Sequence, residues 1–391
     1  MSLAALVGVA LLAVSGLGAA VARWRLRPLF DGARADAAPR SSRSPPRLSV
    51  IIPARDEAHN LPALLASLAE LAPPPHEVLV VDDGSTDGTA EVARAAGATV
   101  VAPAALPPGW IGKAWACQAG ADRATGDWLL FTDADTTHAP WSARAALAAA
   151  QARGATLLSV VPTHTVVSWW EALQGPFWLL LLIACRAGSP AGEQPGSRRF
   201  SIGQYLLFSA DGYRALGGHA RVKGALAEDL ALADAVVGGG GRFASLYAPG
   251  LLGVRMYPEG LGAFLRGWRR SFRAGLTAAG RGGALELVAV IGWLLGVPLG
   301  ALLAAVAGAP AWLGVAAVAY AGSAALLARQ GRGLGRFPRW AALGYPLPVL
   351  AFVAVSALAA FDHLRGAPVT WRGRKIELPA PAPRRAPREA R

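Results

Sequence analysis

The sequence predicts an α/β domain with a mostly parallel, Rossmann-like sheet, joined to membrane-spanning helices at both ends of the chain. Apolar, β-branched segments alternate with segments of helical apolar spacing between residues 48 and 162. Long uncharged stretches lie at the N-terminus and in the last third of the chain. The composition agrees, because 53% of the 391 residues are hydrophobic and the mean hydropathy is +0.37, which fits neither an ordinary soluble domain nor a pure membrane bundle.

Charge and cysteine content narrow the classes of function. The formal net charge is +13, but only Lys113, Lys223 and Lys375 are lysine, and so much Ala, Gly, Pro and Arg is also typical of biased codon usage. No nucleic-acid-binding module accompanies the charge, so no nucleic acid partner is expected. Cys117 and Cys185 lack metal-ligand or disulfide spacing, which indicates a reducing compartment.

Residues 1–22 are predicted to form an N-terminal transmembrane anchor, since the stretch after Met1 carries no charge. Its end resembles a signal-peptidase site, but no basic region precedes it. Three arginines follow at once, which favours a retained anchor with the N-terminus outside and the next residues in the cytoplasm. Residues 23–47 are expected to be a basic linker near anionic lipid.

The α/β domain is expected over residues 48–280. Residues 48–52 form an apolar strand that stops at Pro53, residues 58–71 have helical spacing, and residues 77–81 form a second strand. Strand, helix and strand in this order predict a parallel βαβ unit.

An acidic turn follows the second strand at residues 82–89 and leads into a helical stretch at 90–96. Ligands of open α/β sheets bind beyond the carboxyl ends of strands, where this turn falls. Ser85 or Asp87 as a helix cap is the ordinary explanation. Capping leaves Asp82 and Asp83 unexplained.

Asp133 and Asp135 stand at the end of a predicted strand, residues 128–131. They are two residues apart and point the same way, so together they are placed to hold a divalent cation. Mg²⁺ and Mn²⁺ prefer carboxylate oxygens, take one or two from a protein, and complete their shell with water and diphosphate. Turn formation is the alternative for such a pair. His138 nearby is interpreted as a turn residue and is left out of the metal site.

Together these motifs resemble the inverting family 2 glycosyltransferases with the GT-A fold, over about residues 48–275. The resemblance rests on five motifs in order and at the expected spacing: Ile51–Glu57, Val81–Asp87, Gly112-Lys113, Asp133-Ala-Asp135 and Glu228-Asp229. It implies a divalent metal, Mg²⁺ or Mn²⁺, on Asp133 and Asp135, and a nucleotide-sugar donor, with a UDP-sugar favoured. Residues implied to bind that donor are Pro53, Arg55, Glu57, Asp82, Asp83, Lys113 and Asp133.

The Glu228-Asp229 pair begins a predicted helix, where capping carboxylates are common. By the resemblance, Asp229 is the general base that takes a proton from an acceptor hydroxyl. An acceptor that is already ionised, such as a carboxylic acid, would need Asp229 less. Arg266 and Arg269 match a Gln/Arg-x-x-Arg-Trp motif implied to serve the donor side, but Arg270 replaces its Trp. A single transfer is therefore favoured over processive synthesis, and a basic juxtamembrane cluster is the alternative for these arginines.

Residues 167–185 are rich in Trp, and their uncharged part is too short to span a bilayer. An interfacial helix that docks the domain on the membrane and a buried core helix both remain open.

The C-terminal hydrophobic region, residues 284–362, contains two predicted helices within 287–328 and a further uncharged stretch at 340–361. Three spans after a cytoplasmic domain would leave the basic tail, residues 363–391, outside, against the positive-inside rule. An even number of spans with an internal tail is favoured. Residues 369–375 also resemble the ends of membrane glycosyltransferases that modify carotenoids, hopanoids and sphingolipids.

These observations predict an inverting glycosyltransferase of the cell (inner) membrane, multi-pass, with its catalytic domain in the cytoplasm. It would move a sugar from a nucleotide donor to a lipid acceptor, with a carotenoid or other isoprenoid lipid favoured. Two alternatives stay open. One is a polyprenyl-phosphate sugar synthase, and the other is a non-catalytic membrane assembly protein with a degenerate GT-A domain.

Overall fold

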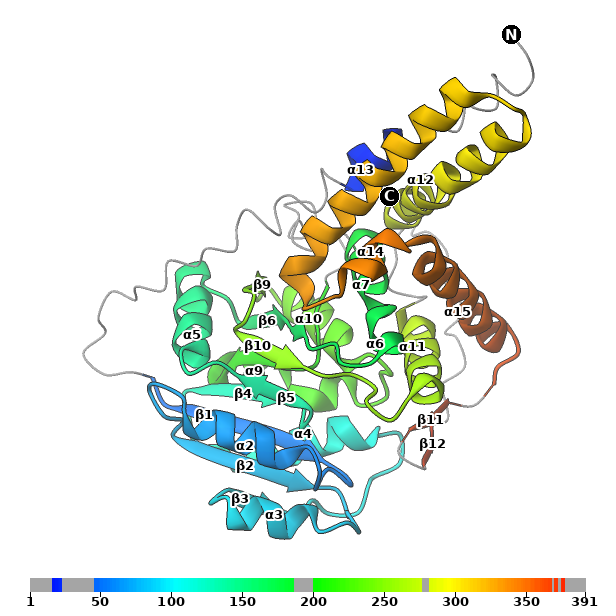
Figure 1. The fold of residues 1–391 in the computed structure, drawn as a ribbon. Helices are drawn as coiled ribbons and strands as arrows, with labels where there is room; N and C mark the ends of the chain where they lie inside the picture. Colours follow the sequence, from blue (N-terminus) through cyan, green and yellow to red (C-terminus); the bar gives the residue numbers. More distant parts are fainter. Residues whose placement is uncertain are drawn as a thin grey trace, which may run out of the picture.

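The computed structural model has a seven-stranded sheet at its centre, in the order β3-β2-β1-β4-β8-β6-β9 (Figure 1). β8 runs antiparallel to both β4 and β6, and the other four adjacent pairs are parallel, so the predicted mostly parallel sheet is confirmed. The strands are β1 (Leu48–Ala54), β2 (Glu77–Asp82), β3 (Thr99–Val101), β4 (Trp128–Thr132), β6 (Leu157–Val161), β8 (Tyr205–Ser209) and β9 (Phe243–Tyr247). The structure describes residues 16–22, 46–185, 200–275, 281–367, 369–371 and 374–376.

Helices cover both faces of the sheet, because successive side chains of a strand point to opposite faces. In β1, Val50 and Ile52 enter one hydrophobic core and Ile51 enters the other, and all three are fully buried. Buried strands with two covered faces are typical of parallel sheets. The first face carries α2 (Leu61–Ala69), α3 (Thr89–Ala95) and α5 (Ser142–Arg153); the second carries α4 (Gly112–Arg123), α9 (Ala210–Leu216) and α10 (Glu228–Gly238).

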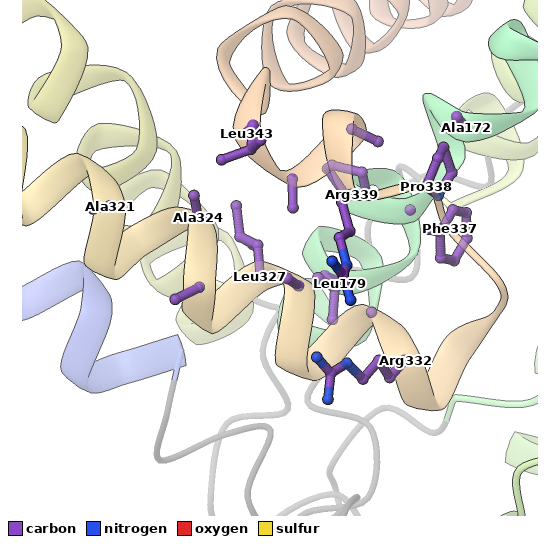
Figure 2. A pocket seen from close by; sticks show the side chains of 17 residues that line it. Ala172, Leu179, Ala321, Ala324, Leu327, Arg332, Phe337, Pro338, Arg339 and Leu343 are labelled. Atoms are coloured by element: carbon purple, nitrogen blue, oxygen red, sulfur yellow. The ribbon is translucent and has the colours of Figure 1, made fainter.

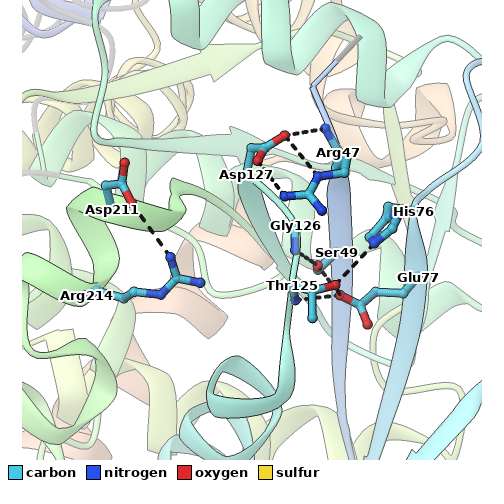
Figure 3. Close-up of polar contacts among 9 residues, drawn as sticks. All are labelled: Arg47, Ser49, His76, Glu77, Thr125, Gly126, Asp127, Asp211 and Arg214. Atoms are coloured by element: carbon cyan, nitrogen blue, oxygen red, sulfur yellow. Dashed lines mark hydrogen bonds and ion pairs between the residues drawn. The ribbon is translucent and has the colours of Figure 1, made fainter. Parts of the chain in front are cut away.

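Polar contacts join the amino-terminal ends of β1, β2 and β4 (Figure 3). The Glu77 carboxylate accepts hydrogen bonds from the Ser49 hydroxyl at 2.6 Å and from the Thr125 backbone N–H at 2.7 Å. Arg47 pairs with Asp127 at 3.0 Å, with both side chains about half exposed, so this pair contributes little stability. These polar contacts thus lie at the amino-terminal ends of the strands, whereas the acidic motifs follow the carboxyl ends.

A second, three-stranded sheet extends from the carboxyl end of β4, in the order β5-β10-β7. Its strands are β5 (Thr136–His138), β7 (Thr163–His164) and β10 (Leu252–Val254). Only residues 133–135 separate β4 from β5, and the Thr132 hydroxyl lies 2.9 Å from that of Thr136 and donates to the Gln204 carbonyl at 2.9 Å. These buried bonds hold the turn that carries both aspartates.

The Trp-rich stretch at 167–185 forms α6 (Trp169–Ala172) and α7 (Gln174–Ala184). α7 is a core helix, the second of the two possibilities that the sequence leaves open. Phe177 is fully buried, and its ring contacts Trp268 and Phe272 of α11 (Leu261–Gly275) at centroid distances of 5.1 and 5.7 Å. Only the start of the stretch is open to the surface, with Trp169 56% exposed. Most side chains of α7 therefore pack against other helices, including α12, α13 and α15.

Three helices are long and apolar enough to cross a membrane by length and composition. They are α12 (Arg281–Val306), α13 (Pro310–Leu334) and α15 (Pro346–Leu364), and the short α14 (Arg339–Leu343) lies between the last two. α12 and α13 form an antiparallel hairpin that projects from the domain, whereas α15 lies beside α11 (Figure 1). The hairpin is held in part by a buried 3.0 Å hydrogen bond from the Trp293 indole to Ser323.

The described part of the predicted N-terminal anchor, residues 16–22, is helical and packs on α12. A Cβ added at Gly18 would lie 2.4 Å from the Ala289 carbonyl oxygen and 2.4 Å from the Trp293 Cβ. Close backbone approach at a small residue is how membrane helices associate. Residues 1–15 and the linker up to residue 45 lie outside the described chain. The tail contributes a two-stranded hairpin, β11 (Val369–Trp371) and β12 (Arg374–Ile376).

Candidate active site

Three charged side chains from distant segments meet beyond the carboxyl end of β4. The Lys113 ammonium, in the first turn of α4, lies 2.8 Å from Asp133 Oδ1 and 3.0 Å from Glu228 Oε1. The three side chains are only 13–29% exposed, so water screens these ion pairs weakly. Lys113 therefore pairs with Asp133 of the first acidic motif and with Glu228 of the second. It makes no ion pair with Asp135 or Asp229, the other carboxylate of each motif.

Asp135 is the carboxylate of the first motif that Lys113 does not pair with. Its Oδ1 atom is buried and has no hydrogen-bond partner in the part of the chain that the structure describes. Burial, followed by the negative charges of Asp133 and Glu57, raises the pKa of Asp135 to about 7. A buried carboxylate oxygen without a partner fits a cation ligand, since a bound divalent ion would supply the missing positive charge.

The number of carboxylates near Asp135 agrees with a metal that is held jointly by the protein and the substrate. No group of three or more His, Cys, Asp or Glu residues suited to a metal occurs among the residues that the structure describes. Mg²⁺ and Mn²⁺ at phosphate sites need only one or two protein carboxylates, because phosphate and water complete the shell. Asp133 and Asp135 fit that role. His138 is buried, and its Nε2 atom lies 3.1 Å from the Thr132 hydroxyl.

Asp229, in the first turn of α10, is the carboxylate of the second motif that Lys113 does not pair with. Its Oδ2 atom accepts a 2.8 Å hydrogen bond from the Gly203 backbone N–H, and its Oδ1 atom accepts one of 2.8 Å from Leu230. Burial and the neighbouring Glu228 raise the pKa of Asp229 to about 7, a value suited to a general base near neutral pH. No side-chain hydrogen bond caps α10, whose N-cap residue is Ala227. The bond from Leu230 satisfies one first-turn N–H group of α10, so stabilisation of the helix end accounts for one oxygen of Asp229 and leaves the bond to Gly203 unexplained.

Gly203 is a glycine for a steric reason. A Cβ added there would lie 3.0 Å from the Lys113 Nζ atom and 3.2 Å from Glu228 Oε1. Replacing Gly203 with alanine is expected to lower kcat/KM for sugar transfer by up to about tenfold, because the Lys113 and Glu228 side chains must shift by a few tenths of an ångström, less than the ~1 Å displacement that costs about 100-fold. Steady-state transfer kinetics would measure it.

The matched control is Gly314→Ala, since a Cβ at Gly314 of α13 meets nothing within 4 Å. Gly314→Ala should leave kcat/KM unchanged. Unaltered kinetics in Gly203→Ala would contradict the view that close packing around Lys113 matters for the reaction.

The two loops that carry the residues implied to bind the nucleotide, after β1 and after β2, are joined by side-chain hydrogen bonds. The loop after β1 donates backbone N–H bonds to the loop after β2: Asp56 to the Ser85 hydroxyl at 2.9 Å, and Ala58 to the Asp87 carboxylate at 3.0 Å. Ser85 thus serves the loops themselves. Asp87 serves both the loops and the helix, because it also accepts the backbone N–H of Thr89, the first residue of α3, at 3.1 Å. Asp82 likewise accepts the Ser85 backbone N–H at 2.9 Å.

The residues implied to bind the nucleotide line this same end of the sheet. Arg55 donates to the Asp83 carbonyl at 3.0 Å, and its guanidinium lies 3.7 Å from the Asp83 carboxylate. Glu57 accepts a 2.7 Å hydrogen bond from the Asn60 side chain and is close enough to Asp135 to affect its pKa. Pro53 is a half-buried residue near the end of β1. These residues come together next to the aspartates.

The arginine of α11 that lies near the acidic cluster is Arg270, not Arg266 or Arg269, which the sequence predicted for the donor side. Arg269 pairs with Asp362 of α15, so its charge is satisfied by the C-terminal region, and Arg266 is exposed. Arg270 is instead close enough to the acidic cluster to influence it. Burial raises the pKa of Asp133, Lys113 lowers it, and Arg270 lowers it further. Sequence reasoning missed Arg270 because it stands where the resembled motif has Trp. The replacement of that Trp by a basic residue was the feature of the sequence that could have indicated its role.

The sheet, the small second sheet and the two acidic motifs together define a GT-A glycosyltransferase fold. The chain superimposes on a mannosyltransferase from Pyrobaculum calidifontis, determined with GDP-Man and Mn²⁺, with a TM-score of 0.55, 21% identity and coverage of 93% of this chain and 99% of that one. Residues 49–198 match the family described as Glycosyl transferase family 2, so the chain carries a family 2 glycosyl transferase domain. The resemblance inferred from the motifs is thereby confirmed.

Two relatives share a more specific name, 4,4'-diaponeurosporenoate glycosyltransferase. The protein from Staphylococcus haemolyticus is 32% identical over 237 residues, or 59% of this chain and 62% of that protein. The one from Staphylococcus aureus strain USA300 is 32% identical over 252 residues, or 64% of this chain and 66% of that protein. The alignment thus spans just under two thirds of each relative's length.

Proposed function

We propose that this protein is an inverting glycosyltransferase that moves a sugar from a nucleotide-sugar donor to a lipid acceptor at the cytoplasmic face of a membrane. The observation that carries the proposal is the meeting of Asp133, Asp135, Lys113 and Asp229 beyond the carboxyl end of β4, next to helices long enough to enter a bilayer. A binding protein has no need for both a cation site and a free carboxylate of raised pKa.

In the proposed reaction, the oxygen of an acceptor hydroxyl attacks the anomeric carbon while the bond to the diphosphate breaks on the opposite face. Asp229 accepts the hydroxyl proton. Asp133 and Asp135 would hold a divalent cation, which when bound neutralises charge on the departing diphosphate. Arg55, Glu57, Asp82 and Asp83 would bind the nucleoside. Lys113 and Arg270 would add positive charge beside the diphosphate.

For the acceptor we propose a carotenoid or other isoprenoid lipid, by analogy with the names of the two relatives. If its attacking group is a hydroxyl, Asp229 accepts the proton. If it is a carboxylate, as in the acid that those names print, the oxygen attacks already ionised and Asp229 has no proton to accept. A UDP-sugar is the first donor to test, and a GDP-sugar is the second, because the similar mannosyltransferase was determined with GDP-Man. Mn²⁺ is the metal to test first for the same reason.

The proposed membrane arrangement has one crossing hairpin, α12–α13, and a re-entrant segment. α13 returns to the domain, where Gly335 bridges His164 and the Arg336 N–H donates to the His164 carbonyl at 3.1 Å. The chain then runs back along α13, where Tyr345 contacts Tyr320 with ring centroids 4.9 Å apart. α15 finally follows α11 to the Arg269–Asp362 ion pair. Both ends of this segment thus contact the catalytic domain.

This arrangement predicts that the basic C-terminal tail lies on the same side of the membrane as the catalytic domain. A C-terminal green fluorescent protein fusion is expected to be fluorescent, and a C-terminal alkaline phosphatase fusion is expected to be inactive. Phosphatase fused after Gly308, in the turn between α12 and α13, is the control and should be active. An active phosphatase at the C-terminus would mean that α15 crosses the bilayer.

A pH profile follows from the raised pKa of Asp229. Because that pKa is about 7, the carboxyl is protonated and cannot accept a proton at lower pH. With a hydroxyl acceptor, kcat is expected to fall about tenfold per pH unit below 7 and to level off above it. The profile should be measured at saturating Mn²⁺, which removes proton competition at Asp135. A flat profile from pH 5.5 to 8 would argue against Asp229 as the base.

Transfer of radiolabelled sugar tests the function directly. Membranes that contain the full chain would be incubated with UDP- and GDP-sugars and total lipid, with and without Mn²⁺. Metal-dependent label in the lipid fraction is expected, and its chromatographic mobility would begin to identify the acceptor. Folded protein that labels no lipid with any donor would refute the lipid-acceptor proposal.

A further inference from the structure

A cavity of about 670 Å³ lies between α7, α13 and α14, outside the acidic cluster (Figure 2). This volume is in the range of ligand-binding pockets, about 300–1,000 Å³. Its lining is almost entirely apolar. The main contributors are Ala172, Leu179, Ala324, Leu327, Phe337 and Ala342. None of the lining residues belongs to the site around Lys113, so the cavity is a separate feature of the molecule.

Two arginines supply the charge of this cavity. Arg332 at the end of α13 and Arg339 at the start of α14 both line it, and Figure 2 shows Arg339 extending from α14 toward α13. Both are exposed, and neither guanidinium has an ion-pair partner within the described chain. An apolar space with two unpaired guanidinium groups suits a ligand with an apolar chain and an anionic head.

The position of the cavity indicates where such a ligand comes from. α13 is a candidate membrane span, and Arg329, Arg332, Arg336 and Arg339 cluster where it ends against the domain. Basic clusters at the cytoplasmic end of a span are attracted to anionic lipids. An acceptor for the sugar would have to bring its reactive oxygen to Asp229, which does not line this cavity.

We propose that the cavity binds one anionic phospholipid, with the phosphate on Arg332 and Arg339 and an acyl chain along Leu179 and Leu327. This site goes beyond the proposed glycosyl transfer and depends only on the helices lying in a membrane. α7, α13 and α14 each contribute to the wall. A bound lipid would therefore also stabilise the packing of the C-terminal helices on the domain.

Lipid retention by the full chain tests the proposal. Purified protein in detergent would be incubated with dioleoylphosphatidylglycerol or dioleoylphosphatidylcholine and examined by native mass spectrometry. The wild type is expected to retain phosphatidylglycerol with about tenfold preference, because both lipids carry a phosphate but the choline cation of phosphatidylcholine is repelled by the two arginines. The double variant R332Q/R339Q should lose that preference. R144Q/R153Q, on exposed positions of α5, is the matched control and should retain it.

A second variant fills the cavity without changing charge. Ala342→Phe should reduce retention of either lipid, and size-exclusion chromatography would verify that it remains folded. Equal retention of the two lipids by the wild type, or undiminished preference in R332Q/R339Q, would overturn the proposal in favour of a non-selective lipid layer. Displacement of phosphatidylglycerol by millimolar inorganic phosphate would overturn it in favour of a soluble anion. Because retention needs no sugar donor, its outcome is independent of the transfer assay.

Discussion

Replacing Asp135 with asparagine is expected to lower kcat for sugar transfer by about 10²–10⁴-fold. The substitution keeps the side-chain shape but removes the buried charge whose Oδ1 atom has no hydrogen-bond partner among the described residues. A metal that stabilises a leaving diphosphate supplies several kcal/mol, and each 1.36 kcal/mol is a factor of ten in rate. Labelled-lipid formation over a range of Mn²⁺ concentrations would measure the loss.

Asp211→Asn is the matched control for that experiment. Asp211 is a fully exposed carboxylate on α9 that pairs with the exposed Arg214 at 3.7 Å (Figure 3). Such a surface pair contributes little, so this variant should match the wild type in rate and in Mn²⁺ dependence. If Asp135→Asn also kept the wild-type rate and Mn²⁺ response, Asp135 would not be a metal ligand.

Replacing Asp229 with asparagine is the second substitution with a large expected effect. For a hydroxyl acceptor, kcat should fall about 10²–10⁴-fold, because the amide cannot accept the proton. KM for the donor should change little, since the proposed role of Asp229 is on the acceptor side. The variant should also lose the decline of kcat below pH 7. Initial rates at saturating donor, measured at several pH values, would test all three expectations.

The size of this loss also reports the chemistry of the acceptor. A carboxylic acid or a phosphate is already ionised and needs no base, so a loss under about tenfold would indicate an acceptor of that kind. That outcome would remove the base role from Asp229 and keep the rest of the site. Asp234→Asn, on an exposed position of the same helix, is the control and should leave the rate unchanged.

The prediction of the fold from sequence succeeded where the signal is local. Apolar strands ending in acidic turns place Asp83, Asp133 and Asp135 at one edge of a parallel sheet, because the carboxyl ends of parallel strands share an edge. The family resemblance follows from the same short motifs and is confirmed by the family match over residues 49–198.

Tertiary structure alone decides which carboxylates are neutralised. Lys113 is 20 residues from Asp133 and 115 from Glu228 in the chain, and no pattern in the sequence indicates that it bridges them. Their pairing leaves Asp135 and Asp229 without this cation, for a metal and a proton respectively, and Asp133 would share its charge between Lys113 and the metal. The distinction depends on distances of about 3 Å between separate elements.

Tertiary structure also decides the burial and the charge pairing of the C-terminal helices. Apolar composition predicted long C-terminal helices, yet it could not tell a buried α7 from an interfacial one, since both are rich in Trp and Leu. Nor could it show that Asp362 pairs with Arg269, 93 residues away, and leaves Arg270 near the acidic cluster. Sequence determined the strands, the motifs and the apolar lengths, because neighbouring residues encode them. Folding decided burial, charge pairing and the cavity beside α13, because these depend on segments far apart in the chain.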